Sequence, residues 1–201
     1  MTKYLTIFFV LVASANPASA KPVSVSPAAA HPKESSFKLT EGSVTFLATG
    51  KPGFLRINGE GGRPVGHFIM DLAHTKVTSG DVTVHLDAFE TGLSTRDRHM
   101  KEIYLETKKF PDAIFTATAL NFKNGNLPGE TDLHGTLTLH GMTKPVTAKV
   151  KVTPQKNTFA IEADFEIVLS EFSIKIPEYA GITVAEKVKV HTTFTAKASN
   201  P

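Results

Sequence analysis

The chain has 201 residues, of which 41% are hydrophobic and 20% are charged. It contains no Cys and no Trp, and its formal charge is +3, from 22 basic and 19 acidic residues. This composition excludes wholesale disorder, a disulfide framework, thiolate metal sites and a cysteine nucleophile. Because the net charge is small and dispersed, we expect no binding to nucleic acid.

Residues 1–20 have the three parts of a secretory signal peptide. Lys3 supplies positive charge, an apolar stretch follows from Tyr4, and Ala18-Ser19-Ala20 is a small-x-small cleavage site. The apolar stretch is shorter than the ~20 residues that a membrane-spanning helix needs. We therefore expect cleavage after Ala20, export to the periplasm or beyond, and no stable membrane insertion. Residues 21–35, rich in Pro, Ala, Ser and Lys, predict a flexible tether before a folded domain at 36–198.

From Ser36 onward, apolar and polar residues alternate with a period of two, which is typical of strands with one buried and one exposed face. The alternation is clearest at residues 81–89, 132–140, 146–152, 158–167 and 187–195, and weaker at 43–48, 54–59, 66–72 and 113–122. Eight or nine strands with short turns and little helix predict an all-β antiparallel barrel or sandwich.

One segment breaks this period. Between Ser94 and about Phe110, Ser94 with Asp97 resembles a helix N-cap, while Met100, Ile103 and Tyr104 share a helical face. We expect a short helical cap over one end of a barrel. The glycine-rich run at residues 59–62 precedes a strand rather than a helix, so it predicts a turn and not a phosphate site.

The predicted buried faces of the five clear strands carry no charge. They mix bulky residues with small ones, which are Ala117, Ala119, Gly135, Ala148 and Ala163 once the weaker strand 113–122 is included. A barrel of about eight strands either holds one small ligand or is filled by its own side chains. Small residues among large ones fit a lined cavity and a packed taper equally, so the residues alone leave both open.

No catalytic constellation is visible. The chain lacks Gly-x-Ser-x-Gly, Ser-x-x-Lys and His-Glu-x-x-His, and its acidic residues stand singly on exposed faces. His134 and His140 share a strand face but lie roughly 20 Å apart at ~3.3 Å per residue. We therefore expect no enzyme activity and no metal site, and interpret His85, His134, His140 and His191 as solvated exterior residues.

The cluster Arg96-Asp97-Arg98-His99 opens the predicted cap. Asp97 there would complement the helix dipole, and the basic groups could meet an anion at the barrel mouth. A local structural role, with Asp97 capping and Arg96 pairing nearby, is the other interpretation.

Two blocks resemble one family, the YceI-like proteins, which are exported bacterial lipocalin-like barrels associated with polyisoprenoid binding. The first is residues 135–146 (GTLTLHGMTKPV), and the second is residues 95–100 (TRDRHM) followed by Tyr104-Leu105 and Phe110-Pro111. The resemblance covers roughly residues 36–197. Leu169 and Ser173 depart from the family pattern, where Arg and Gly are usual, so we expect a salt bridge or a head-group contact to be lost and the loop to be reshaped.

The resemblance implies an elongated eight-stranded antiparallel lipocalin-like barrel with a short helical cap, whose interior holds one isoprenoid, quinone or fatty-acid derivative and no other cofactor. The expected cavity residues are Phe68, Met70, Val84, Leu86, Met100, Tyr104, Phe115, Leu137, Phe159, Phe165 and Phe172, with head-group contacts from Arg96, Arg98 and His99. The alternative is an exported protein-interaction module with a solid core. An exposed edge strand would be the feature supporting a homodimer.

Overall fold

The structure is a computed structural model that describes residues 34–51, 55–71, 73, 76–118, 120–121, 129–179 and 181–199. The predicted signal peptide, residues 21–33 of the predicted tether, and Ala119 lie outside the described residues. The first strand begins at Glu34, two residues before the predicted start of the folded domain.

Strands make up most of the described chain, as the period of two predicts. The strands are β1 (Glu34–Lys51), β2 (Arg56–Gly61), β3 (Val65–Asp71), β4 (Lys76–His85), β5 (Asp112–Ala117), β6 (Leu120–Asn121), β7 (Gly129–Leu139), β8 (Met142–Gln155), β9 (Thr158–Val168), β10 (Glu178–Tyr179), β11 (Ile182–Val184) and β12 (Lys187–Ala198). The helical segments are η1 (Leu86–Ala88), α1 (Ser94–His99), the π-helix η2 (Met100–Tyr104) and η4 (Leu169–Phe172).

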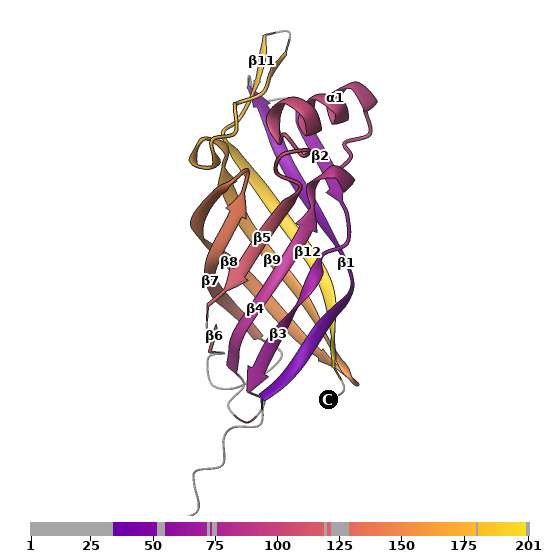
Figure 1. Cartoon of the computed structure of the whole chain (residues 1–201), viewed down its shortest axis with the longest axis vertical. Coiled ribbons are helices and arrows are strands. Elements are labelled where there is room, and N and C mark those ends of the chain that lie inside the picture. The colour runs from indigo at the N-terminus through magenta and orange to yellow at the C-terminus, as the bar shows by residue number, and fades with distance from the viewer. Residues whose placement is uncertain are drawn as a thin grey trace, which may run out of the picture. The chain divides into compact units, whose positions relative to one another are not determined.

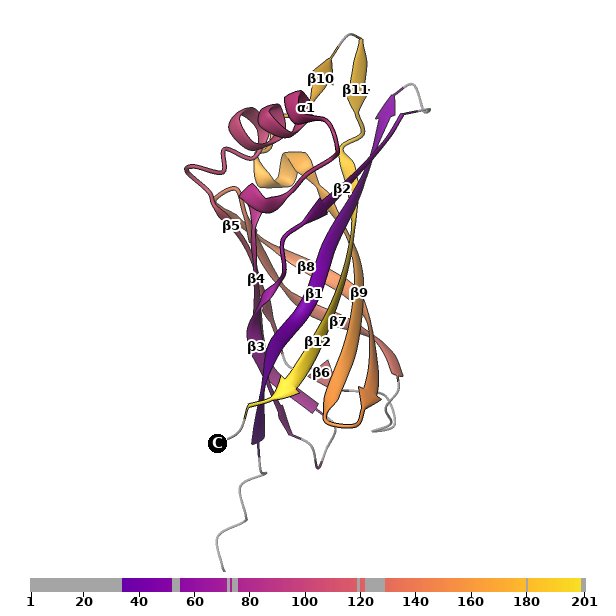
Figure 2. The same cartoon turned by 90° about the vertical axis from the view of Figure 1, so that its right-hand side faces the viewer.

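Eight strands close into an antiparallel barrel (Figures 1 and 2). They pair in the order β1, β12, β9, β8, β7, β5, β4, β3, and the circle closes where β3 pairs again with β1. Phe37 of β1 marks the closure, because it lies opposite Phe68 of β3 on one side and Ala198 of β12 on the other. The predicted fold class is confirmed.

The long strand β1 has two partners on one of its edges. Its first residues pair with β3, and residues 44–49 pair with β2. The β10–β11 hairpin then joins the end of β1, with Gly50 opposite Val184. As a result strands β10 and β11, the end of β1 with the start of β2, and the α1–η2 helix all lie at one end of the barrel (Figure 2).

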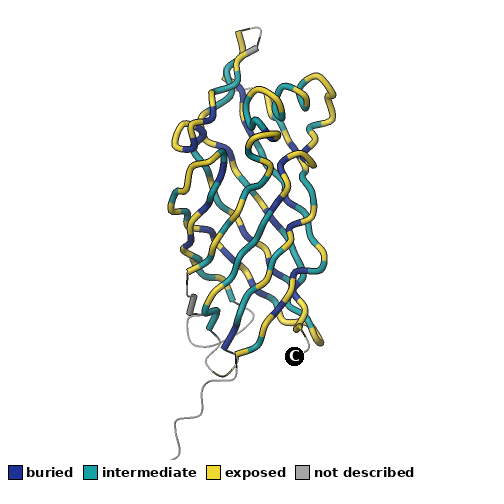
Figure 3. Tube along the Cα trace, viewed as in Figure 1, coloured by how far each residue is buried: buried dark blue, intermediate teal, exposed yellow. Residues whose placement is uncertain are grey.

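Burial follows the predicted alternation. In β8, Ala148, Val150 and Val152 are buried whereas Lys149 and Lys151 are exposed, and Figure 3 shows the same alternation along neighbouring strands. Removing the apolar faces from water is the main stabilising term of such a barrel.

Four local predictions need correction. The run Gly59-Glu60-Gly61 is part of β2 rather than a turn, and the predicted strand at 81–89 ends at His85, where η1 begins. The cap is shorter than predicted, ending at Tyr104. Ser94 is not its N-cap: the N-cap is Leu93, which makes no side-chain capping bond.

Candidate functional site

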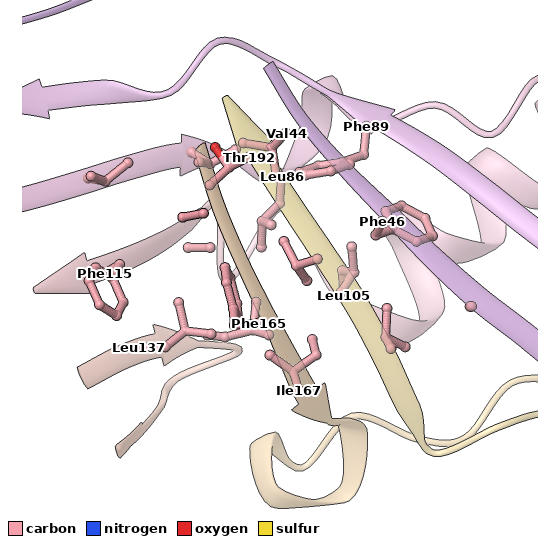
Figure 4. Close-up of a pocket in the computed structure, with 18 of the residues that line it drawn as sticks. Val44, Phe46, Leu86, Phe89, Leu105, Phe115, Leu137, Phe165, Ile167 and Thr192 are labelled. Atoms are coloured by element: carbon pink, nitrogen blue, oxygen red, sulfur yellow. The ribbon is translucent and has the colours of Figure 1, made fainter. Parts of the chain in front are cut away.

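The barrel encloses an apolar cavity of about 780 Å³. Figure 4 shows Phe115, Leu137 and Phe165 approaching it from one side and Val44 and Leu86 from the other. The cavity is of the size that ligand sites in proteins usually have, about 300–1,000 Å³. Its wall is built from the inward faces of the strands, together with side chains from the loop after η1 and from η2.

Ten of the eleven predicted cavity residues line this space. They are Phe68, Met70, Val84, Leu86, Met100, Tyr104, Phe115, Leu137, Phe159 and Phe165. The prediction for Phe172 needs correction, because this residue does not line the cavity. It lies in η4, which follows β9, and its side chain is buried in the core. The period of two ends at Val168, before η4 begins, so strand alternation does not determine the direction of the Phe172 side chain.

Several lining residues were not predicted. Val188 and Val190 lie on the apolar face of the strand predicted at 187–195, so its periodicity was enough to predict them as lining residues. Phe89 and Leu105 also line the cavity, but they come from loops. A loop residue has no periodic pattern that would reveal the direction of its side chain.

The small residues on the inner face have two different roles. The rings of Phe46, Phe89 and Phe115 lie directly over Gly59, Gly61 and Gly135, where a Cβ would meet ring atoms at 2.1–2.4 Å. These glycines make room for neighbouring aromatic rings, an arrangement known as aromatic rescue of glycine. Ala148 and Ala163, by contrast, line the cavity itself. Both interpretations of the small residues therefore hold, at different positions.

Aromatic rings fill the end of the barrel opposite α1. Phe37 stacks on Phe68 with ring centroids 5.1 Å apart and meets Phe159 edge-on at 5.2 Å. Met70, beside them in the same core cluster, is almost fully buried. Phe68 and Phe159 also line the cavity, so this packing forms its wall at that end.

Polar side chains are scarce in the middle of the cavity. Among the described polar residues that line the cavity, Thr192 is buried, and its hydroxyl donates a hydrogen bond to the Ser43 carbonyl at 3.2 Å. Among the described residues, no buried side-chain nitrogen or oxygen lacks a hydrogen-bond partner. Most polar lining residues lie instead at the cap end: Thr91, Ser94, Thr95, Arg96, His99, Tyr104 and Glu178. His67 and Asp81, the remaining polar lining residues, pair with each other at 2.9 Å.

The charged cluster of the cap is held by Thr91. Asp97 accepts hydrogen bonds from the backbone N–H and the hydroxyl of Thr91, while Arg96 donates to that hydroxyl at 2.7 Å and to the Thr91 carbonyl at 2.8 Å. Arg96 and His99 line the cavity, whereas Arg98 is exposed and does not. The structure therefore brings two of the three predicted head-group residues to the mouth, with Arg96 already bonded locally.

Histidines on the barrel exterior pair with carboxylates across strands. His85 lies 2.5 Å from Asp112, and His191 lies 2.8 Å from Asp164; both pairs are solvent-accessible. The expectation that His140 is solvated is wrong, because its side chain is nearly buried and is hydrogen-bonded to Glu106 and to the Phe172 carbonyl.

Within the described ranges, no group of three or more His, Cys, Asp or Glu side chains is arranged to hold a metal ion. In the same part of the chain, no helix has the length and apolar character needed to cross a membrane.

Comparisons with known proteins agree with this architecture. Residues 30–196 match the model of the YceI-like domain. Protein YceI of Escherichia coli O157:H7 is 34% identical over 117 residues, and so is that of Shigella flexneri. Each alignment covers 55% of this chain and 59% of the relative, so the chain spans less than two thirds of the curated relatives that it matches.

Solved structures share the fold at lower identity. BcnA of Burkholderia cenocepacia superposes with a TM-score of 0.66 and 19% identity, over 78% of this chain and 96% of that one. A domain from Saccharophagus degradans, described as polyisoprenoid-binding and implicated in plant cell wall breakdown, gives 0.62 and 14%, over 81% and 98%. At these identities the likeness concerns the fold.

Proposed function

The chain belongs to the YceI-like family, and from that premise we propose that it is an exported, non-catalytic carrier or store for one long-chain lipid of the isoprenoid, quinone or fatty-acid class. The observation that carries the proposal is the apolar cavity of about 780 Å³ inside the barrel. A fold relative described as a polyisoprenoid-binding domain supports the same ligand class. The predicted signal peptide supports export to the periplasm or beyond.

The distribution of polar groups gives the ligand an orientation. A tail in the middle of the cavity meets apolar side chains and the already bonded Thr192, whereas Thr91, Thr95 and His99 lie at the cap end. A polar head group loses hydrogen bonds with water when it is buried without partners. The lipid therefore enters tail first, and its head group stays beside α1 and η2.

The cavity volume sets the affinity scale. At ~30 Å³ each, the volume share of a water molecule in the liquid, 780 Å³ has room for at least about 26 chain atoms. At ~0.3 kcal/mol per ligand atom, such a chain contributes about 8 kcal/mol, which corresponds to a micromolar dissociation constant. A chain of about 40 atoms that fits fully reaches about 12 kcal/mol and nanomolar affinity.

A protein-interaction module with a solid core is the alternative function. Its distinguishing feature is an interior too small for an acyl chain, and the cavity of about 780 Å³ argues against it. An enzyme acting on lipid would need a nucleophile or an acid–base pair facing the tail. Of the described polar residues that line the cavity away from the cap, Thr192 is bonded to the Ser43 carbonyl, and His67 and Asp81 pair with each other with side chains that are 54% and 41% exposed.

The first test is mass spectrometry of the protein purified from its exporting host, under native and then denaturing conditions. We expect a stoichiometric apolar adduct that is released on denaturation, and the intact mass reports cleavage after Ala20 directly. A clean ligand-free mass, together with no uptake of added ubiquinone or polyprenol, would contradict the carrier function.

Ubiquinone homologues with side chains of increasing length provide a second test. Each isoprene unit adds about five carbons, or about 1.5 kcal/mol, so affinity should rise about tenfold per unit. The rise should continue for about five units and then weaken as the cavity fills. Affinity that does not depend on chain length would place the binding outside the barrel.

A charge in the wall tests the location of the tail. Leu137→Asp puts a carboxylate into the cavity and should abolish uptake, because the tail cannot hydrate it. Thr136→Asp is the matched control, since Thr136 is the exposed neighbour on the outer face of β7. Circular dichroism verifies that both variants are folded. A folded Leu137→Asp variant that still binds would show that the wall is misassigned.

A further inference from the structure

Three groups of described residues surround the α1 end of the cavity, and we call them the rim: residues 50–51 with 55–56, residues 92–104, and residues 174–179 with 181–184. They contain the end of β1 with the start of β2, the α1–η2 helix and strands β10 and β11, which lie at the same end of the barrel (Figure 2). Each segment contributes lining residues, such as Leu55, Leu93 and Ile182. The rim is therefore the boundary between the apolar interior and the solvent.

The rim exposes large apolar side chains. Leu93 is 57% exposed, and Leu55 and Ile182 are each 38% exposed. Leu55 and Ile182 flank Gly50: a Cβ built there would lie 3.0 Å from Leu55 Cβ and 2.9 Å from Ile182 Cγ2. Since all three side chains also line the cavity, the apolar surface continues from the inside of the barrel to its outside. Exposed apolar surface of this kind marks an interaction site.

Basic side chains outnumber acidic ones on the same rim. Asp97 and Arg96 are already engaged with Thr91. The other charged residues of the rim are Lys51, Arg56, Arg98, Lys101 and Lys175 against Glu102 and Glu178. The rim thus combines exposed apolar groups with an excess of positive charge. That is the combination with which peripheral proteins bind anionic bilayers.

We propose that the rim docks reversibly on an anionic lipid bilayer, with Leu55, Leu93 and Ile182 entering the acyl boundary and the basic residues meeting the head groups. This inference rests on the proposed carrier function and adds to it the surface from which the lipid is taken. Because the rim's apolar groups are continuous with the cavity lining, a lipid tail passes from bilayer to barrel without crossing water.

Vesicle flotation tests the proposal. Protein purified after export is mixed with vesicles of phosphatidylcholine containing phosphatidylglycerol, after its intact mass has shown that residues 1–20 are absent, because an uncleaved apolar segment would itself bind. Wild-type protein should float. The triple variant Leu55→Glu/Leu93→Glu/Ile182→Glu should partition at least about tenfold less. Val65→Glu is the matched control, since Val65 is 45% exposed but does not line the cavity.

The charge requirement is tested separately. Arg98→Glu and Lys175→Glu should each reduce partitioning by about fivefold or more, and only on vesicles that contain phosphatidylglycerol. Wild-type protein that does not float, or a triple variant that floats equally well, would overturn the proposal. Equal loss in Val65→Glu would also overturn it, because binding would then not be confined to the rim.

Uptake of ubiquinone from detergent solution, measured by native mass spectrometry, separates the two hypotheses. Uptake without flotation would overturn the docking proposal and leave the carrier function standing. Flotation without uptake would overturn the carrier function while supporting a bilayer-binding rim. In Lys175→Glu we expect uptake from detergent to persist and transfer from vesicles to fall, because Lys175 is an exposed rim residue that does not line the cavity.

Discussion

The imidazole of His140 lies with its Nε2 2.8 Å from Oε2 of Glu106, 34 positions earlier in the chain. Its Nδ1 donates to the Phe172 carbonyl at 3.1 Å, and its ring packs on Phe110 with centroids 4.5 Å apart. One side chain therefore ties the segment after the cap helix to the β7–β8 turn and to η4. Glu106, His140 and Ser173 have positive φ values of 46°, 51° and 57°, so the chain adopts left-handed backbone at three positions around this contact.

His140→Ala should lower the free energy of unfolding by about 2–4 kcal/mol. The variant loses a nearly buried hydrogen bond and the packing on Phe110, and it keeps a left-handed backbone that suits Ala poorly. Glu106→Gln should cost less than about 1 kcal/mol, because the Glu106 side chain is 44% exposed and its ionic contribution is screened. Urea denaturation followed by circular dichroism measures both. Equal losses would mean that the contact with Glu106 dominates.

The Gly135 position in β7 should not accept a side chain. An added methyl group would lie 2.4 Å from Phe115 Cζ and 2.6 Å from the Thr116 carbonyl oxygen. Because a ring and a backbone atom both obstruct it, Gly135→Ala should destabilise the protein by about 2–3 kcal/mol. Gly92→Ala is the comparison: its φ is +84° and nothing lies within 4 Å, so it should cost only about 1 kcal/mol. Thermal denaturation that ranks them in the opposite order would contradict this account.

Strand periodicity predicted the barrel wall well because each strand has one wet and one dry face. The strand predicted at 158–167 is observed as Thr158–Val168, and the one predicted at 187–195 as Lys187–Ala198. The turn predicted at residues 59–62 was wrong for Gly59–Gly61, which lie in β2, and the reason is non-local. Glycine favours turns locally, but here the rings of Phe46 and Phe89 cover these glycines within the barrel, and nothing near them in the sequence reveals that contact.

The predictions for the site residues likewise succeeded within strands and failed in loops. Leu137 and Phe165 line the cavity as alternation predicts, because they lie within regular strands. His140 follows the last residue of β7, where the backbone turns left-handed and directs the imidazole toward Glu106 and the Phe172 carbonyl instead of the solvent. Ser94 is of a residue type that commonly caps helices, yet the N-cap is Leu93. Asp97 is bonded by Thr91, which comes from the preceding loop. Such partners depend on how loops fold back, which a single sequence does not encode locally.

Filling the cavity should affect stability and ligand binding in opposite directions. Ala163 of β9 is buried and lines the cavity, so the ring in Ala163→Phe enters empty space. The ligand-free protein should gain about 1–3 kcal/mol of stability from the added apolar burial, whereas uptake of ubiquinone should fall at least about tenfold. Glu162→Phe, on the exposed face of the same strand, should change neither. Urea denaturation measures the stability of both variants, and native mass spectrometry measures their uptake of ubiquinone. Destabilisation of Ala163→Phe with unchanged uptake would contradict a ligand in this space.

Tyr104 offers an intrinsic reporter of where the head group lies. The chain has no Trp, and its tyrosines are Tyr4, Tyr104 and Tyr179, of which Tyr104 lines the cavity at the cap end. A quinone ring close to a phenol quenches its fluorescence, so ubiquinone binding should quench tyrosine emission. Tyr104→Phe should remove most of that quenching while changing the affinity by less than about threefold, because only a hydroxyl is lost.

The control for this experiment is native mass spectrometry, which must show that Tyr104→Phe still takes up ubiquinone, so that lost quenching is not lost binding. Quenching that persists in Tyr104→Phe would mean that the quinone ring lies away from η2. The tail-first orientation would then be wrong, although the carrier function itself would stand, because the cavity would still hold the lipid in the reverse direction.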